Sequence, residues 1–281
     1  MLEWSGDLAD QHGLRLEDQK LVPDDAGCSN VTDDNESDIT IEDELKAFEE
    51  PKKPIPPVHV QLALRSLERT KHFISSPHPH LRLCSLHILR LALLIIADCR
   101  NEQSKKFDDD LLPLIHQNWA AVASRFAPGE DLNVTRAAFD VVTTMARISR
   151  TFVYRKIVDS VFAPAAEFLI TSAPKSVKSH PIYHQSGRYK LQRSYLTQFQ
   201  QLISDISIVE QHIDSVVDGC FPYLNREQPE VLNVAATLTL KWLAQQFPVK
   251  TKELVNTSTE RLSFAGRELC SASVNAIFDE G

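Results

Sequence analysis

From residue 58 onward, apolar side chains recur every three or four residues, and this periodicity constrains the fold more than any other feature of the chain. Such spacing places apolar side chains on one face of an α-helix, whereas a half-buried strand alternates polar and apolar residues. We find no convincing strand-like alternation. Polar and proline-containing turns divide the pattern, and the helices we expect cover 58–74, 81–99, 111–126, 132–150, 151–173, 183–206, 207–224, 227–247 and 249–256.

Consecutive helices pair along the chain into units close to the HEAT and armadillo period. Neither helix of such a pair can bury its apolar face alone, so stacked pairs share one continuous core. The sequence predicts an all-α, HEAT/armadillo-like solenoid of about eight to nine helices over 58–255, followed by a weakly structured tail over 256–281. The expected pairs are 58–99, 108–148, 151–206 and 207–247.

Three local signals refine this prediction. Segment 81–99 is apolar almost all round, which predicts a helix enclosed by its neighbours. Pro164 predicts a kink or a division of its helix, because proline lacks the backbone N–H. Ser207 and Glu210 have the spacing of a capping box, which predicts a helix start at Ser207.

The N-terminal segment is strongly acidic. Residues 1–50 contain 16 Asp and Glu against 3 Lys and Arg, whereas the rest of the chain carries 22 acidic and 27 basic residues. An acidic segment with few apolar residues cannot offset the entropy of ordering, so we expect 1–57 to be a disordered acidic tail with a proline-rich linker. Ser37 and Thr40 are candidate sites for an acid-directed kinase; a solubilising spacer is the alternative.

Several protein classes are disfavoured by what the chain lacks. It has 8 glycines, with neither GxGxxG nor GxxxxGK[ST], and its 5 cysteines are scattered without a CxxC pair. We therefore expect no cofactor and no metal. The acidic start does not resemble a signal peptide, and the apolar stretch 88–97 is about half the length of a membrane span. These features predict a cytoplasmic protein without membrane association, with the nucleus as a second compartment.

Two groups of histidines need an interpretation. In LLPLIHQNWAAVASRF (111–126), His116 and Trp119 share a helical face, but no neighbouring nucleophile or carboxylate completes a catalytic group. We expect His116, Gln117 and Trp119 to serve repeat packing or partner binding. His180 and His184 have the spacing of half a zinc site without the two further ligands, so a metal-dependent hydrolase is a remote alternative.

A basic cluster interleaved with aromatic residues follows the fifth expected helix. This pattern suits nucleic acid or an acidic partner segment, although the mildly basic body does not by itself favour nucleic acid. An ordinary solvated face and docking of the chain's own acidic tail are the alternatives. The cluster comprises Lys175, Lys178, Arg188, Lys190 and Arg193 around Tyr183 and Tyr189.

Over about 54–255 the chain resembles the C-terminal region of one family, the first Tel-two-interacting protein. The most specific segment is P-L-x-H-Q-x-W, here Pro113 to Trp119, and Tyr183, Lys190, Leu191 and Gln192 support it. Family members are much longer than this chain, and the residues after 255 match less well.

The resemblance implies a non-catalytic HEAT-repeat scaffold of the Triple-T co-chaperone complex. Its partners would be the other two subunits, Tel-two and the second Tel-two-interacting protein. The complex supports maturation of phosphatidylinositol-3-kinase-related kinases together with a general chaperone. The alternative is another HEAT-type adaptor, such as a transport receptor or a phosphatase scaffold. The candidate residues for repeat packing or partner binding are His116, Gln117, Trp119, Tyr183, Arg188, Lys190 and Gln192.

Overall fold

The computed structural model describes residues 56–103, 108–176 and 183–278. The chain divides into two compact units, Met1–Lys53 and Pro54–Gly281, and all described residues belong to the second. The predicted acidic tail, except for Pro56 and Pro57, lies outside the described residues. So do both candidate phosphorylation sites, Ser37 and Thr40.

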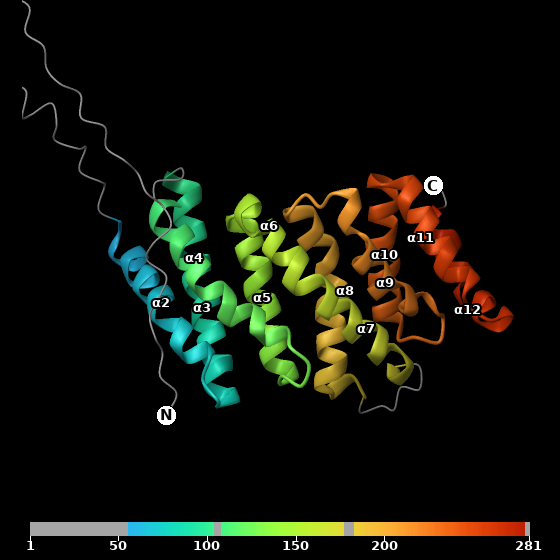
Figure 1. Ribbon diagram of the computed structural model, residues 1–281, viewed down its shortest axis with the longest axis horizontal. Helices are drawn as coiled ribbons and strands as arrows, with labels where there is room; N and C mark the ends of the chain where they lie inside the picture. The colour runs from blue at the N-terminus through green and yellow to red at the C-terminus, as the bar shows by residue number, and fades with distance from the viewer. Residues whose placement is uncertain (1–55, 104–107, 177–182, 279–281) are drawn as a thin grey trace, which may run out of the picture. The chain divides into compact units, whose positions relative to one another are not determined.

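The regular structure of the described residues is entirely helical, which confirms the predicted fold class (Figure 1). Short 3-10 helices follow α4 and α9 and precede α8 and α9. The α-helices are α2 (Val58–Ile74), α3 (Pro79–Gln103), α4 (Asp108–Ala123), α5 (Leu132–Ile148), α6 (Arg150–Ile157), α7 (Ala163–Ser176), α8 (Gly187–Asp205), α9 (Asp214–Cys220), α10 (Glu230–Gln246), α11 (Pro248–Glu260) and α12 (Phe264–Phe278).

The helices form two rows, as a helical-repeat solenoid requires. Row B consists of α3, α5, α8, α10 and α12, each packed against the next. Row A consists of α2, α4, α6 with α7, α9 and α11, in which α2 packs on α4 and α9 packs on both α7 and α11. The colour order in Figure 1 follows this stacking from one end of the array to the other. Successive pairs therefore share one core, as predicted.

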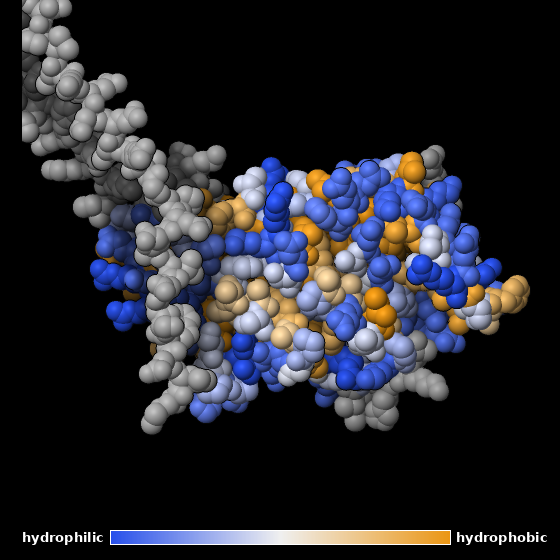
Figure 2. Space-filling model, viewed as in Figure 1, coloured by the Kyte–Doolittle hydropathy of each residue, from blue (hydrophilic) through white to orange (hydrophobic). Residues whose placement is uncertain are grey.

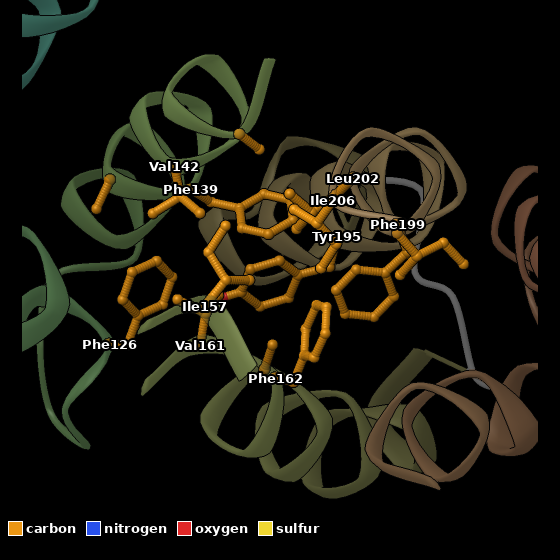
Figure 3. Close-up of a cluster of buried hydrophobic side chains, with 14 of the residues drawn as sticks. Phe126, Phe139, Val142, Ile157, Val161, Phe162, Tyr195, Phe199, Leu202 and Ile206 are labelled. Carbon is orange, nitrogen blue, oxygen red and sulfur yellow. The ribbon is translucent and has the colours of Figure 1, made fainter. Parts of the chain in front are cut away.

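Large aromatic side chains fill the middle of this core (Figure 3). The ring of Phe139 on α5 meets Tyr195 on α8 edge to face, with centroids 4.6 Å apart. Tyr195 stacks on Phe199 at 5.9 Å, and Phe162 meets Phe199 edge to face at 6.3 Å. Each of these side chains is buried. Burying an aromatic side chain contributes roughly 2–3 kcal/mol, so this cluster is a major link between the second and third pairs.

The interruption expected at Pro164 takes the form of a π-turn. Residues Val158–Phe162 form one π-helical segment between α6 and α7, and the helix continues beyond it. Proline has no N–H for the carbonyl four residues earlier and its ring crowds that position, so a wider turn accommodates it.

The capping box predicted at Ser207 is wrong. Ser207 has φ 50 and ends α8 in a Schellman motif, in which its own N–H bonds the Ser204 carbonyl and the Ile208 N–H bonds the Ile203 carbonyl, each at 3.0 Å. The next α-helix begins only at Asp214. A residue in the left-handed region terminates a helix, so Ser207 cannot also begin one in the extended conformation that a cap adopts.

The C-terminal segment is helical, contrary to the weakly structured tail that we predicted. Helix α12 packs against α10 and buries Cys270 and Ile277. The Leu269 carbonyl of α12 also accepts a hydrogen bond from the Arg226 N–H, at 3.0 Å. Long-range contacts of this kind leave little trace in local periodicity, which explains the error.

Helix α3 departs from its prediction in two ways. Pro79–Cys99 is long and apolar enough, by length and composition alone, to cross a membrane, although the stretch 88–97 by itself is not. One side of α3 packs on α2 and α5, but Ile88, Leu91 and Ile95 are exposed rather than enclosed. The reason is position: α3 is the first row B helix among the described residues, so only one row neighbour covers it.

Candidate interaction surface

The LLPLIHQNWAAVASRF stretch forms most of α4 and the short 3-10 helix after it, and its side chains contact α6. Trp119 is only 7% exposed, and the Lys156 ammonium lies 6.0 Å from the centroid of its ring. Lys156 also contacts His116, with its Nζ 3.2 Å from the imidazole Nδ1, and the His116 ring meets Phe152 edge to face at 6.3 Å. Trp119 is thus a packing residue, whereas His116 and Gln117 remain exposed at the surface. Gln117 accepts a hydrogen bond from Lys71 of α2 at 3.3 Å.

The most constrained residue in this stretch is one that the sequence analysis missed. Asn118 is fully buried, and its amide Nδ2 donates to the Leu67 carbonyl at 2.8 Å and to the Leu114 carbonyl at 2.9 Å. Its Oδ1 accepts from the Thr70 hydroxyl at 3.3 Å. A sequence signal existed, because Asn118 interrupts an otherwise apolar helical stripe. The other residues of that stripe are Leu111, Ile115 and Val122.

Tyr183 and Gln192 belong to a second buried polar network. The Tyr183 hydroxyl donates to the Gln192 Oε1, and the Gln192 Nε2 donates to the Tyr223 hydroxyl at 2.8 Å and to Ser172 at 3.0 Å. The Tyr223 hydroxyl in turn donates to the Leu169 carbonyl at 3.0 Å. Burial raises the pKa of both tyrosines, which keeps these hydroxyls protonated as donors. This network holds α8 against α7 and the segment after α9, so Gln192 is a packing residue.

The basic cluster keeps its charges at the surface, whereas one of its two tyrosines is buried and the other, Tyr183, is half-buried. Lys190 and Arg193 are exposed on α8, and Arg188 is half-buried. Tyr189 is buried, with its ring 4.7 Å from that of His184. A stacking platform for bases needs accessible rings, so this arrangement favours an acidic protein segment over a nucleic acid. Lys175 is exposed at the end of α7, while Lys178 and His180 lie outside the described residues.

Chemically reactive groupings are sparse in the part of the chain that the structure describes. There, no group of three or more His, Cys, Asp or Glu side chains is placed to hold a metal ion. Burial raises the pKa of the Cys220 and Cys270 thiols, which disfavours the nucleophilic thiolate. Of the two histidines of the zinc half-site, His184 is exposed and His180 lies outside the described residues.

A cleft of about 410 Å³ is lined by residues of the segment between α4 and α5, of α7 and of α8. Phe126 and Tyr195 form part of its apolar wall, and Glu167 and Glu130 contribute carboxylates. Glu130 is already held by Arg82 at 2.8 Å and by Arg125 at 2.7 Å. This partly buried ion triad links α3 to the turn before α5, so Glu130 is a structural residue rather than a free acid.

Exposed apolar side chains gather on α10. Val231, Val234 and Leu238 are each about half exposed, at 46%, 47% and 53%. A groove of about 380 Å³ separates them from α8, and a second of about 260 Å³ separates them from α12. We call these three side chains the α10 ridge. In the view of Figure 2, hydrophobic side chains likewise reach the surface in patches between hydrophilic ones, which suits a protein-binding array.

Comparisons with known proteins agree with this architecture. The model of the TTI1 C-terminal TPR domain family matches residues 7–248. TELO2-interacting protein 1 homolog from Homo sapiens is 29% identical over 237 residues, covering 81% of this chain and 21% of the relative. Its counterpart from Mus musculus is 28% identical over 232 residues, covering 79% and 20%. The chain thus spans about a fifth of the length of these relatives. No solved structure matches.

The family description names TPR repeats, whereas the spacing of the sequence predicted HEAT-like ones. Both repeat types are stacked pairs of antiparallel helices. The row A helices here begin at residues 58, 108, 150, 214 and 248, so the repeat length varies along the chain. The fold and the family description therefore agree at the level of the helical pair. Because the family model covers most of the residues, the chain belongs to the TTI1 C-terminal TPR domain family.

Proposed function

We propose that the chain is a non-catalytic scaffold segment that binds other helical-repeat proteins within the Triple-T complex. Its partners would be Tel-two and the second Tel-two-interacting protein, and the assembly would support maturation of phosphatidylinositol-3-kinase-related kinases with a general chaperone. The relatives are named for interaction with TELO2. The observation that carries the proposal is the α10 ridge, an apolar surface between two grooves. No other helix of the described residues covers the ridge, so it is free to contact another protein.

The arrangement of the candidate residues supports a binding role over catalysis. Trp119, Gln192 and Tyr183 are engaged in packing and hydrogen bonds between repeats. Lys190 and Gln117 stand at the surface, where they can contact another protein. Substitution of the packing residues is expected to lower stability, whereas substitution of Lys190 is expected to change binding alone.

We also propose that the chain acts in the cytoplasm, or in both cytoplasm and nucleus, without entering a membrane. Supporting this, α3 contributes Leu86, Leu89 and Leu93 to the common core, so insertion into a bilayer would dismantle the first repeat. Cell fractionation of a tagged full chain tests the point. Recovery in the carbonate-resistant membrane fraction would contradict it.

Co-expression with Tel-two and the second Tel-two-interacting protein tests the scaffold role. We expect a stoichiometric complex that survives affinity purification and size-exclusion chromatography at moderate salt. The control omits this chain and asks whether the same two subunits are retained. A folded, helical chain that binds neither subunit would refute the proposal. Capture of a transport GTPase or a phosphatase catalytic subunit in their place would indicate the other type of adaptor.

A further inference from the structure

We propose that the face formed by α8, α10 and α12 binds an amphipathic helix of a partner protein. The apolar stripe of that helix would pack on the α10 ridge, and carboxylates beside the stripe would face the basic side chains of α8 and α10. This inference rests on the proposed scaffold function and specifies the surface and the partner chemistry. Figure 1 shows the three helices in the yellow-to-red half of the array.

The ridge has the geometry of a helix-binding surface. Val231, Val234 and Leu238 are spaced three and four residues apart, so they line one face of α10. The opposite face of the helix is fully buried through Leu232, Ala236, Leu240 and Leu243. The core therefore has its own set of α10 side chains, and the ridge is an additional apolar stripe. Single exposed apolar residues are ordinary, but a stripe of three beside grooves marks an interaction site.

The two grooves extend this surface across three helices. The groove towards α8 is lined by Leu196, Thr197 and Gln200, and both grooves share Val234 and Leu238 of the ridge. A ridge between parallel grooves matches the way in which helices pack, with the ridges of one helix lying in the grooves of another. The α12 side is lined by small side chains, Ala272, Ser273 and Ala276, which allow a backbone to approach closely.

The charges around the ridge indicate an acidic partner. Arg193 and Lys190 are exposed one and two turns, respectively, before Thr197 on the same face of α8. Lys241 follows Leu238 by one turn on α10 and is half-buried. None of these three has an ion-pair partner within the described residues. Glu230 supplies a carboxylate at the edge of the α8 groove, so the basic side chains outnumber it.

This charge pattern also disfavours a second copy of the chain as the occupant. A symmetric dimer through this face would bring Lys190, Arg193 and Lys241 of both copies together, and like charges at an interface repel. A helix with an apolar stripe and flanking Asp or Glu satisfies both parts of the surface. Such helix-in-groove recognition relies on anchors at three- and four-residue spacing.

Binding of the full chain to the purified pair of partner subunits tests the surface. Val234→Gln/Leu238→Gln removes the apolar stripe while keeping residues that favour a helix. Because buried anchors dominate binding energy, we expect the Kd of this double variant to rise about tenfold or more. The matched control is Ile170→Gln, a side chain of 44% exposure on α7 in row A, for which we expect a Kd within about twofold of wild type.

A second set of variants tests the contribution of charge to partner binding. Lys190→Glu/Arg193→Glu should weaken binding at low salt and flatten the dependence of Kd on salt concentration. Arg155→Glu, on the exposed surface of α6, is the control and should leave both unchanged. Matching thermal unfolding midpoints establish that the variants fold like wild type.

The outcomes separate this inference from the function on which it rests. Wild-type chain that binds neither subunit overturns the scaffold proposal and this one together. Wild-type binding that survives the ridge substitutions leaves the scaffold role intact and overturns the ridge as its surface. Binding that requires the ridge but is unaffected by salt concentration and by the charge reversals would overturn the inference that the partner helix is acidic. A dimer of the chain alone that dissociates on ridge substitution would assign the face to self-association and also overturn the inference.

Discussion

Asn118 offers the sharpest test of how the repeats are held together. Its amide is fully buried between α2 and α4, donates two hydrogen bonds and accepts a third. Asn118→Ala deletes these bonds and leaves a space the size of the amide. Each of the three buried hydrogen bonds contributes about 1 kcal/mol net, and the space adds to the loss, so we expect about 3–4 kcal/mol of destabilisation.

A second substitution distinguishes the loss of volume from the loss of hydrogen bonds. In Asn118→Leu the space is filled, and the groups left behind retain other partners. The Thr70 hydroxyl still donates to the Leu67 carbonyl at 3.1 Å, and the Leu67 and Leu114 carbonyls lie within helices that supply N–H donors. The expected cost is therefore at least about 1 kcal/mol smaller than that of Asn118→Ala.

Urea unfolding of the full chain, followed by circular dichroism, measures both values if the slope m is unchanged. Asn275→Ala, an exposed helical asparagine on α12, is the matched control and should stay within about 0.5 kcal/mol of wild type. The reasoning is refuted if Asn118→Ala costs less than the control limit. Equal costs for Ala and Leu would contradict the claim that the remaining polar groups keep their partners.

Three further predictions concern other parts of the fold. Ser207→Gly should stabilise the chain by about 0.5–1 kcal/mol in urea unfolding, because glycine adopts positive φ without strain. This gain includes the loss of the hydrogen bond from Arg150 to the Ser207 hydroxyl, and a net loss of stability would contradict the strain argument. Partial burial and then Asp214 raise the pKa of the Asp218 carboxyl, so its ionisation weakens the folded state once pH exceeds the unfolded pKa of about 3.9. Asp218→Asn should therefore be slightly more stable than wild type at pH 7, with the difference vanishing at pH 3, and a gain that persists at pH 3 would exclude ionisation as its cause. Under native conditions a thiol reagent should modify exposed Cys84 far faster than buried Cys220, as peptide mass spectrometry can measure, and equal rates would contradict the burial of Cys220.

Helix positions followed from sequence wherever one buried stripe determined them. The periodicity predicted 58–74, and α2 spans Val58–Ile74 because its apolar stripe is also its buried face. At α12, the residues that bury side chains are only Cys270 and Ile277, so periodicity carried little signal. The prediction of a helix start at Ser207 was wrong for a different reason. A serine followed by a glutamate three residues later matches a helix start, but the chain there was still completing the C-terminus of α8.

The candidate site was predicted less completely than the fold. Trp119 was assigned to repeat packing or partner binding, and its burial on the apolar face of α4 makes it a packing residue. The role of Gln192 depends on Tyr223, 31 residues away, and local spacing cannot reveal such a pair. The α10 ridge was also missed. Helix α10 is apolar on two faces, and only the stacking of α8 and α12 decides which of those faces is left uncovered.

Side-chain amides recur at the boundaries between successive helical pairs. Each joins two elements that apolar contacts alone would leave free to slide, because apolar packing is non-directional. The links are Asn118 to the Leu67 carbonyl at 2.8 Å, Gln198 to Asp140 at 3.1 Å, Gln192 to Tyr223 at 2.8 Å, and Asn233 to the Tyr223 carbonyl at 2.8 Å and to Ser273 at 3.2 Å.

These bonds bear directly on binding at the α10 ridge. In the proposed mode of binding, a partner helix meets α8, α10 and α12 together, so a shift of one helix along another would misalign the ridge with its grooves. Asn233 bonds Ser273 of α12, and Gln192 ties α8 to the segment that leads into α10, so directional bonds hold the three helices in one register. A surface whose geometry is set before binding loses less entropy when the partner arrives. In the proposed mode of binding, these amides would contribute to affinity by fixing the register of the three helices, in the same way that they contribute to the stability of the array.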